Sequence, residues 1–191
     1  MKYRTFPGTE VSVSEVGFGL WTLSTGWWGD VTDERAIGML RRAHDDHGIT
    51  FFDAADAYGN GRSERQLATA FKGKRQDVVY GTKIGYDIYD EVAAKARRGQ
   101  AELPHRLEPK FMRYAVDQCL ERLDTDYIDV LQLHNIKMDH VRDPQIWETL
   151  RASWCAKERS SRGAPLSGPP SAGCTRRWSS SSASRTSTQS R

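Results

Sequence analysis

The stretch Phe51-Phe-Asp-Ala-Ala-Asp-Ala-Tyr-Gly59 places polar side chains directly behind a short apolar run. Residues 49–53 predict a buried strand, because they form a brief apolar segment that follows the helix-stopping Gly48. Asp53 ends this strand, and Tyr58 follows five residues later. Barrel enzymes carry their catalytic groups on the segments that follow the parallel strands. The stretch therefore predicts one strand of a parallel sheet and part of a site.

The same pattern recurs twice further along the chain. A strand predicted at residues 78–82 is followed by Lys83, and a strand predicted at residues 127–133 is followed by His134. A first apolar strand is predicted at residues 16–21. Because the carboxyl ends of parallel strands lie at one edge of a sheet, we expect the polar groups that follow them to converge.

Helical segments separate these strands, and a hairpin predicted at residues 5–16 precedes them all. The helix-start signals are Thr32 as an N-cap, Ser63 with Gln66 as a capping box, Pro109 at the first helical position, and a last helix beginning within residues 144–150. Strand and helix thus alternate four times, which predicts a parallel sheet covered by helices.

Two architectures fit this alternation: an open doubly wound sheet and a (β/α)8 barrel of the TIM type. An open nucleotide-binding sheet usually has a Gly-x-Gly-x-x-Gly turn after its first strand. Gly17-Phe-Gly19 is followed by Leu-Trp-Thr, so the third glycine is missing. We therefore favour the barrel, with residues 1–150 supplying the hairpin and the first four β/α units.

The four converging residues suit proton transfer to a carbonyl oxygen. A lysine ammonium beside a tyrosine favours the phenolate, and an aspartate beside the lysine keeps that lysine charged and oriented. Such a tyrosine can donate a proton while hydride arrives at the carbonyl carbon. A histidine near the same oxygen can orient the substrate or share the proton.

These segments resemble the aldo-keto reductase family over residues 1–150. The matching motifs are Phe51 to Gly59 as quoted, its continuation Gly-Asn-Gly-Arg-Ser-Glu-Arg-Gln-Leu at 59–67, Thr-Lys-Ile-Gly at 82–85, and Tyr-Ile-Asp-Val-Leu-Gln-Leu-His at 127–134. The start Met-Lys-Tyr-Arg is similar to the family's hairpin, which closes the bottom of the barrel.

The resemblance implies an oxidoreductase that reduces aldehydes and ketones with NADP(H), less often NAD(H), and without a metal. Tyr58 is then the general acid, Asp53 and Lys83 tune it, and His134 positions the carbonyl. The residues implied for binding are Gly19, Leu20, Trp21 and Asp53 for the cofactor, and Trp21, Trp27, Trp28 and His134 for the substrate, with the segment 85–106 shaping the substrate site. For the tryptophans, ordinary loop packing is an equally good interpretation.

The composition argues against nucleic-acid-binding, membrane-spanning and metal-binding classes of protein. Residues 1–150 hold 20 basic and 24 acidic side chains without a basic stripe, so no nucleic-acid partner is expected. No apolar run approaches the length of a membrane span, and no signal peptide is recognisable. The three cysteines lack metal spacing, which favours reduced thiols in a cytoplasmic protein. The pair His44 and His47 precedes Gly48, which favours helix capping over metal binding.

The segment 151–191 differs from the rest of the chain. It contains twelve Ser and seven Arg but no Val, Ile, Phe or Tyr, so it predicts either a disordered tail or out-of-frame translation. Codons for residues 171–179 can be written so that a shifted frame reads IGWLYEAVE, which resembles an amphipathic family segment. In that case barrel strands five to eight, which supply most cofactor contacts in the family, are missing, and we expect the chain to be truncated and inactive.

Two alternatives stay open at this point. One is a non-catalytic barrel relative that binds NADP as a sensor or a channel-associated subunit, since such relatives keep the catalytic residues. The other is a half-barrel that completes itself by dimerising. The sequence leaves the oligomeric state, the physiological substrate and the choice between NADP and NAD undecided.

Overall fold

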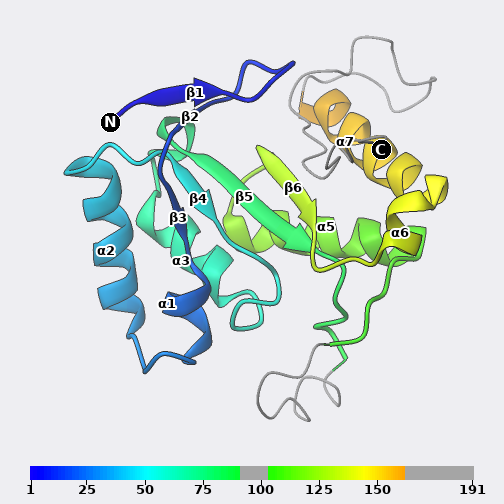
Figure 1. Cartoon of the computed structure of the whole chain (residues 1–191), viewed down its shortest axis with the longest axis horizontal. Coiled ribbons are helices and arrows are strands. Elements are labelled where there is room, and N and C mark those ends of the chain that lie inside the picture. Colours follow the sequence, from blue (N-terminus) through cyan, green and yellow to red (C-terminus); the bar gives the residue numbers. More distant parts are fainter. Residues whose placement is uncertain (91–102, 162–191) are drawn as a thin grey trace, which may run out of the picture.

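The computed structural model describes residues 1–90 and 103–161, with side chains described as far as residue 152. Its centre is a parallel sheet of four strands in the order β3 (Gly17–Gly19), β4 (Phe51–Asp53), β5 (Val79–Ile84) and β6 (Val130–Leu133) (Figure 1). Sequential strands are neighbours throughout, as short right-handed crossovers require. The predicted parallel sheet is confirmed.

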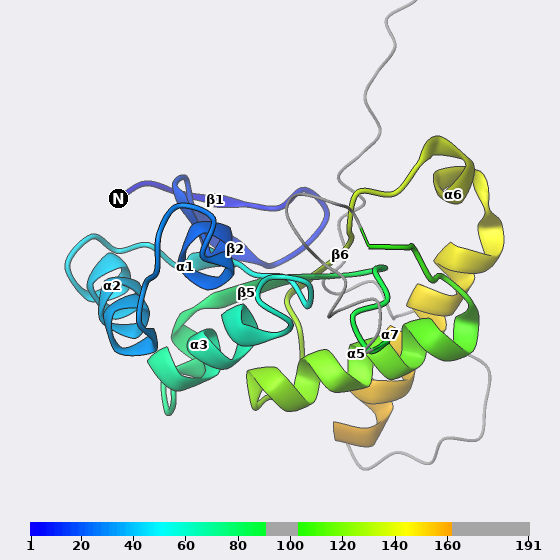
Figure 2. The ribbon, with the colours of Figure 1, turned by 90° about the horizontal axis from the view of Figure 1, so that it is seen from below.

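A hairpin of β1 (Tyr3–Thr5) and β2 (Ser12–Ser14) precedes the sheet. Ser14 and Thr50 exchange hydrogen bonds of 2.9 Å between backbone N–H groups and hydroxyl oxygens, and the ring of Phe6 meets Phe51 edge-on at 6.1 Å. These contacts hold the hairpin at the amino end of β4, on the side of the sheet away from helices α3 (Arg62–Ala70) and α5 (Pro109–Leu123) (Figure 2). The carboxyl edge of β4 is left clear of the hairpin.

Helices α3 and α5 cover the sheet on the side opposite the hairpin (Figure 2). In chain order the helical elements are α1 (Trp21–Thr25), α2 (Asp33–Asp45), α3 (Arg62–Ala70), the short 3-10 helix η1 (Arg75–Asp77), α5 (Pro109–Leu123), α6 (Met138–Arg142) and α7 (Pro144–Ser161). None of the helices within residues 1–90 and 103–161 is both long and apolar enough to cross a membrane.

Three predicted helix starts are confirmed and one is wrong, and α7 begins at Pro144 as predicted. The Thr32 hydroxyl caps α2 by accepting a hydrogen bond from the Arg35 N–H, and Pro109 opens α5. Gly61, in the left-handed region at φ 78°, occupies the N-cap of α3 and leaves no capping box there. Ser63 instead bonds to the backbone of Ala55, because tying the preceding turn to the helix satisfies more buried polar groups than a cap would.

Other boundaries differ from the prediction more modestly. Trp21 begins α1, whereas the sequence placed it at the end of a strand. The short helix α6 was not predicted, and α7 continues past Leu150 to Ser161. The expectations for residues 91–102 of the long segment, and for residues 162–191 of the tail, lie outside the described residues.

The core lies between the sheet and its helices. Phe52 on β4 is fully buried, and its ring packs at 4.7 Å from Phe71 and at 6.2 Å from Phe18. The same core cluster contains fully or nearly fully buried apolar side chains from α2, α3 and α5, among them Leu40, Leu67, Ala115, Met112 and Leu123.

Replacement of Phe52 by alanine tests this core. We expect Phe52→Ala to lower the free energy of unfolding by about 3–5 kcal/mol, because it leaves a cavity beneath the sheet. Urea unfolding followed by circular dichroism measures the change. Met39→Ala on α2 is the control, since Met39 is 40% exposed and its loss should cost little. Equal losses for the two variants would contradict the placement of Phe52.

Candidate active site

The site is built around an ion pair between neighbouring strands. The Lys83 ammonium lies 2.7 Å from the Asp53 carboxylate and donates a second hydrogen bond, of 2.8 Å, to the Ala54 carbonyl. The Lys83 side chain is only 12% exposed, so these partners replace the water that the charge has lost. Gln132 on β6 donates to the other Asp53 oxygen at 3.1 Å, which joins three strands in one polar cluster.

Tyr58 and His134 lie beside this cluster. The Lys83 Nζ stands 4.8 Å from the centroid of the Tyr58 ring, and the His134 ring meets Tyr58 edge-on with centroids 5.4 Å apart. All four predicted side chains therefore come together at the carboxyl edge of the sheet. Lys83 and Asp53 are paired, and Tyr58 lies between the ammonium and the imidazole.

The turn of residues 54–61 delivers Tyr58 to this position. Its backbone continues the ladder of β5, because Ala54 N–H donates to the Gly81 carbonyl and Asp56 N–H to the Lys83 carbonyl. The turn then closes on itself through the Gly61 N–H, which donates to the Asp56 carbonyl at 2.6 Å. Tyr58 is consequently held by strand pairing as well as by its own contacts.

Several polar and aromatic residues near the site were not singled out from the sequence. Gln132 had a usable signal, since it stands two residues before His134 and so lies on the same face of β6. Tyr86 packs at 4.8 Å from His134 and stacks on His105 at 4.6 Å. His105 in turn bonds to the His134 carbonyl at 2.8 Å. This contact depends on a fold-back after β5 that has no local sequence signal.

The residues predicted to bind cofactor and substrate lie at the same edge. Gly19 pairs in register with Asp53, and a Cβ placed on Gly19 would meet nothing within 4 Å. Leu20 is 0% exposed and belongs to the core, and its N–H donates to the Asp53 carbonyl at 3.0 Å. Trp21 meets Trp27 at 4.9 Å and Trp28 at 6.5 Å, with Trp28 76% exposed.

The two histidines before Gly48 do not form part of this site. His44 Nδ1 lies 3.0 Å from the Ile49 carbonyl, a contact at the end of α2. Within residues 1–90 and 103–161, no group of three or more His, Cys, Asp or Glu side chains has the arrangement of a metal site.

Asp56, inside the turn, carries a buried carboxyl. It is 0% exposed, and neither of its oxygens accepts a side-chain hydrogen bond from the described residues. Burial raises the pKa of Asp56 well above its ordinary value, and the negative charge of Glu64 adds to the effect, while Arg122 and Lys83 oppose it. The protonated form of Asp56 is therefore favoured inside the fold.

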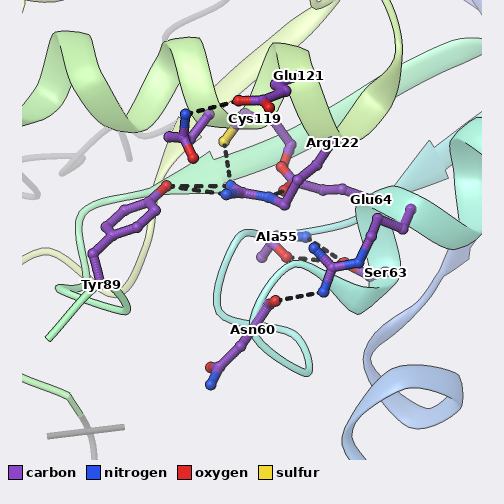
Figure 3. A network of polar contacts seen from close by, with 11 residues as sticks. Ala55, Asn60, Ser63, Glu64, Tyr89, Cys119, Glu121 and Arg122 are labelled. Carbon is purple, nitrogen blue, oxygen red and sulfur yellow. Dashed lines mark hydrogen bonds and ion pairs between the residues drawn. The ribbon is translucent and has the colours of Figure 1, made fainter. Parts of the chain in front are cut away.

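Glu64 and Arg122 form a buried ion pair on the helix side of the turn (Figure 3). Glu64 is 0% exposed and the Arg122 side chain 11% exposed. The Arg122 guanidinium also donates hydrogen bonds of 3.2 and 3.3 Å to the Tyr89 hydroxyl oxygen. In the sequence, Glu64 stands out only as part of the family motif at residues 59–67. No sequence pattern predicts that it pairs with Arg122.

The structure is a parallel α/β sheet of the barrel type with Asp, Tyr, Lys and His at its carboxyl edge, and the comparisons with known proteins give the family. The sequence profile of the Aldo/keto reductase family matches residues 15–154, and the chain belongs to this family.

Individual relatives agree with this assignment. The chain is 33% identical over 136 residues to the aldo-keto reductase YhdN of Bacillus subtilis, covering 70% of this chain and 38% of the relative. It is 30% identical over 137 residues to a probable voltage-gated potassium channel subunit beta of Arabidopsis thaliana, covering 70% and 37%.

The solved structures give the fold. An aldo-keto reductase from Bacillus halodurans in its holo form superposes with a TM-score of 0.63 at 31% identity, covering 85% of this chain and 47% of that one. Such relatives are (β/α)8 barrels, which confirms the predicted fold class for the part present here. The match covers less than half the length of these three relatives.

The buried Asp56 carboxyl predicts a pH dependence of stability. Because the pKa of Asp56 is raised in the folded state, the fold binds this proton more tightly than the unfolded chain does. The stabilisation of the fold by the Asp56 proton is therefore fully present below 3.8, the pKa of Asp56 in the unfolded chain. It is lost as the pH rises through the pKa of Asp56 in the fold. Asp56→Asn removes this ionisation, so its stability relative to the unmodified chain should improve as the pH rises.

Urea unfolding at several pH values between acid and mildly alkaline conditions measures this difference. Asp126→Asn, at an exposed carboxylate, is the matched control and should show no such trend. A difference between Asp56→Asn and the unmodified chain that stays constant with pH would show that Asp56 ionises freely in the fold.

Proposed function

We propose that the protein reduces aldehydes or ketones to alcohols with a nicotinamide cofactor, and that Tyr58 is its general acid. The observation that carries this proposal is the placement of the Tyr58 ring between the Lys83 ammonium and the His134 imidazole, with Lys83 anchored by Asp53. Membership of the aldo/keto reductase family supports the same reaction class.

Each residue has a distinct part in this reaction. When bound, the cofactor supplies hydride to the carbonyl carbon. Tyr58 donates its phenolic proton to the carbonyl oxygen, because a nearby ammonium stabilises the phenolate that is left behind. Asp53, with the Ala54 carbonyl, holds Lys83 in place for that purpose. His134 orients the carbonyl oxygen toward Tyr58.

The cofactor and substrate are assigned to adjoining parts of the same edge, which share Trp21. NADP(H), or alternatively NAD(H), would lie against Gly19, Trp21 and Asp53, where Gly19 leaves open space beside the strand end, with the buried Leu20 supporting this surface from within the core. A small carbonyl compound would lie near His134 and the rings of Trp21, Trp27 and Trp28. The exposure of Trp28 supports a role in contact with a ligand. A cytoplasmic location belongs to the same proposal.

We also propose that the 191-residue chain does not turn over by itself. Residues 1–90 and 103–161 provide four parallel strands, whereas the solved relatives are eight-stranded barrels about twice as long. The family match ends at residue 154, close to the change of composition at residue 151. Out-of-frame translation beyond this point is part of the proposal, and resequencing the gene around codons 150–154 tests it.

A second candidate function is a non-catalytic NADP-binding subunit. The 30% identity to a probable potassium channel subunit beta favours it. The two candidates differ in turnover: a binding subunit retains the cofactor and reduces carbonyls slowly or not at all when its barrel is complete.

Reconstitution of a complete barrel tests the reductase directly. We expect co-expression of this chain with the second half of the Bacillus subtilis relative to yield NADPH-dependent aldehyde reduction, and the chain alone to yield none. Tyr58→Phe in the reconstituted enzyme should lower kcat by about 100- to 10,000-fold, because it removes the general acid. Oxidation of NADPH followed at 340 nm measures both effects.

Tyr114→Phe is the matched control, since Tyr114 lies on α5 and is 47% exposed. It should keep the reconstituted rate. Full activity of the Tyr58→Phe enzyme would exclude the proposed acid, and turnover by the isolated chain would overturn the proposal that it is inactive.

A further inference from the structure

Arg122, near the end of α5, joins three elements at one buried guanidinium. Its Nε bonds to the Glu64 carboxylate on α3 at 2.5 Å, and its terminal nitrogens donate to the Tyr89 hydroxyl in the segment after β5 (Figure 3). Only arginine offers this set of donors in one planar group. The pair therefore ties α3, α5 and the segment after β5 together behind the sheet.

Glu64 also connects Arg122 to β5, the strand that carries Lys83. The Thr82 hydroxyl donates to the second Glu64 oxygen at 2.6 Å, and Thr82 is fully buried. Thr82 immediately precedes Lys83 on β5, and the two side chains lie on opposite faces of the strand. Glu64 thus fixes α3 against β5 at the residue next to Lys83.

The turn that carries Tyr58 rests on this pair. A Cβ placed on Gly61 would collide with the Arg122 side chain, so the backbone of the turn touches the guanidinium directly. Gly61 closes the turn onto Asp56, and Ser63 N–H donates to the Tyr58 carbonyl at 3.2 Å. A shift of Arg122 or Glu64 would therefore be passed to the backbone on both sides of Tyr58.

We propose that Glu64 and Arg122 are positioning residues for Tyr58, which they hold at its observed place beside Lys83 and His134. This inference rests on the proposed role of Tyr58 as the general acid for its effect on rate. The positioning itself is a property of the fold and can be measured without turnover.

A second buried ion pair in the same domain provides a matched control. Arg75 in η1 bonds to Asp129 at 2.8 Å, with side chains 16% and 3% exposed, and Asp129 also accepts from the Tyr80 N–H. This pair lies at the amino ends of β5 and β6, away from the turn. Its disruption should destabilise the fold without moving Tyr58.

The first experiment compares Glu64→Gln, Arg122→Lys and Asp129→Asn in the full 191-residue chain. Native-state hydrogen exchange follows the amides of Asp56, Tyr58 and Gly61, and NMR of 13C-tyrosine-labelled protein follows the Tyr58 ring, assigned with Tyr58→Phe. We expect the first two variants to speed turn exchange by about tenfold or more and to shift the Tyr58 resonance. Asp129→Asn should do neither, although it lowers stability.

Arg122→Lys keeps the positive charge and removes only the branched set of hydrogen bonds. The variant is therefore expected to fold, so that its effect can be assigned to the lost hydrogen bonds. The Glu64→Gln/Arg122→Lys double variant should resemble either single variant, since the two residues act as a unit. An unshifted Tyr58 resonance with unchanged turn exchange in both single variants would overturn the proposal. An equal response to Asp129→Asn would also overturn it.

The second experiment measures rate in the reconstituted barrel. Glu64→Gln and Arg122→Lys should lower kcat about ten- to hundredfold with KM nearly unchanged, because a displaced acid affects the chemical step more than binding. If the unmodified barrel shows no turnover, the proposed reductase function fails while the exchange and NMR results still decide the positioning. Turnover with normal kcat in both variants would refute positioning alone.

Discussion

The neutralisation of the Lys83 ammonium between two strands is the constraint on which the site depends. A nearly buried ammonium is costly unless a carboxylate and further acceptors replace its water. Asp53 and the Ala54 carbonyl do so only in the observed register, with Asp53 opposite Gly81, because a shift of one residue would turn Lys83 to the other face. A Cβ on Gly81 would crowd the Phe51 ring at 3.2 Å, so glycine there keeps this register accessible.

The position of Tyr58 follows from the same pairing. The chain leaving β4 continues to bond along β5 at Gly81 and Lys83 before it turns, so residue 58 is carried over the lysine. These backbone groups of the turn are therefore hydrogen-bonded within the fold. The Asp56 side chain is buried there, close to the charges of Glu64 and Arg122. The turn is tied to both the strand and the helices, and the burial that results raises the pKa of Asp56 well above its ordinary value.

The features that could be predicted from the sequence are those set by local pattern. The apolar runs that end at Asp53, Lys83 and His134 predict parallel strands. Because a polar residue ends or follows each of these strands, the sequence also predicts that the polar residues lie together at the carboxyl edge of the sheet. Contacts that depend on tertiary packing could not be predicted. Ser63 matches a capping box locally, yet its hydroxyl serves the Ala55 backbone once the turn packs against α3. The Glu64–Arg122 pair joins residues 58 positions apart, and no short-range spacing indicates it.

The two halves of the proposed reaction differ in how much structure they require. Proton transfer needs Asp53, Tyr58, Lys83 and His134, which come from three consecutive strands, so the pairing of β4, β5 and β6 is sufficient to assemble it. Hydride transfer needs a surface long enough to hold a dinucleotide, and the proposed contacts at Gly19, Trp21 and Asp53 cover only the ends of the two neighbouring strands β3 and β4. The proton-donating set can therefore be fully formed in a four-stranded sheet while turnover still depends on a complete barrel.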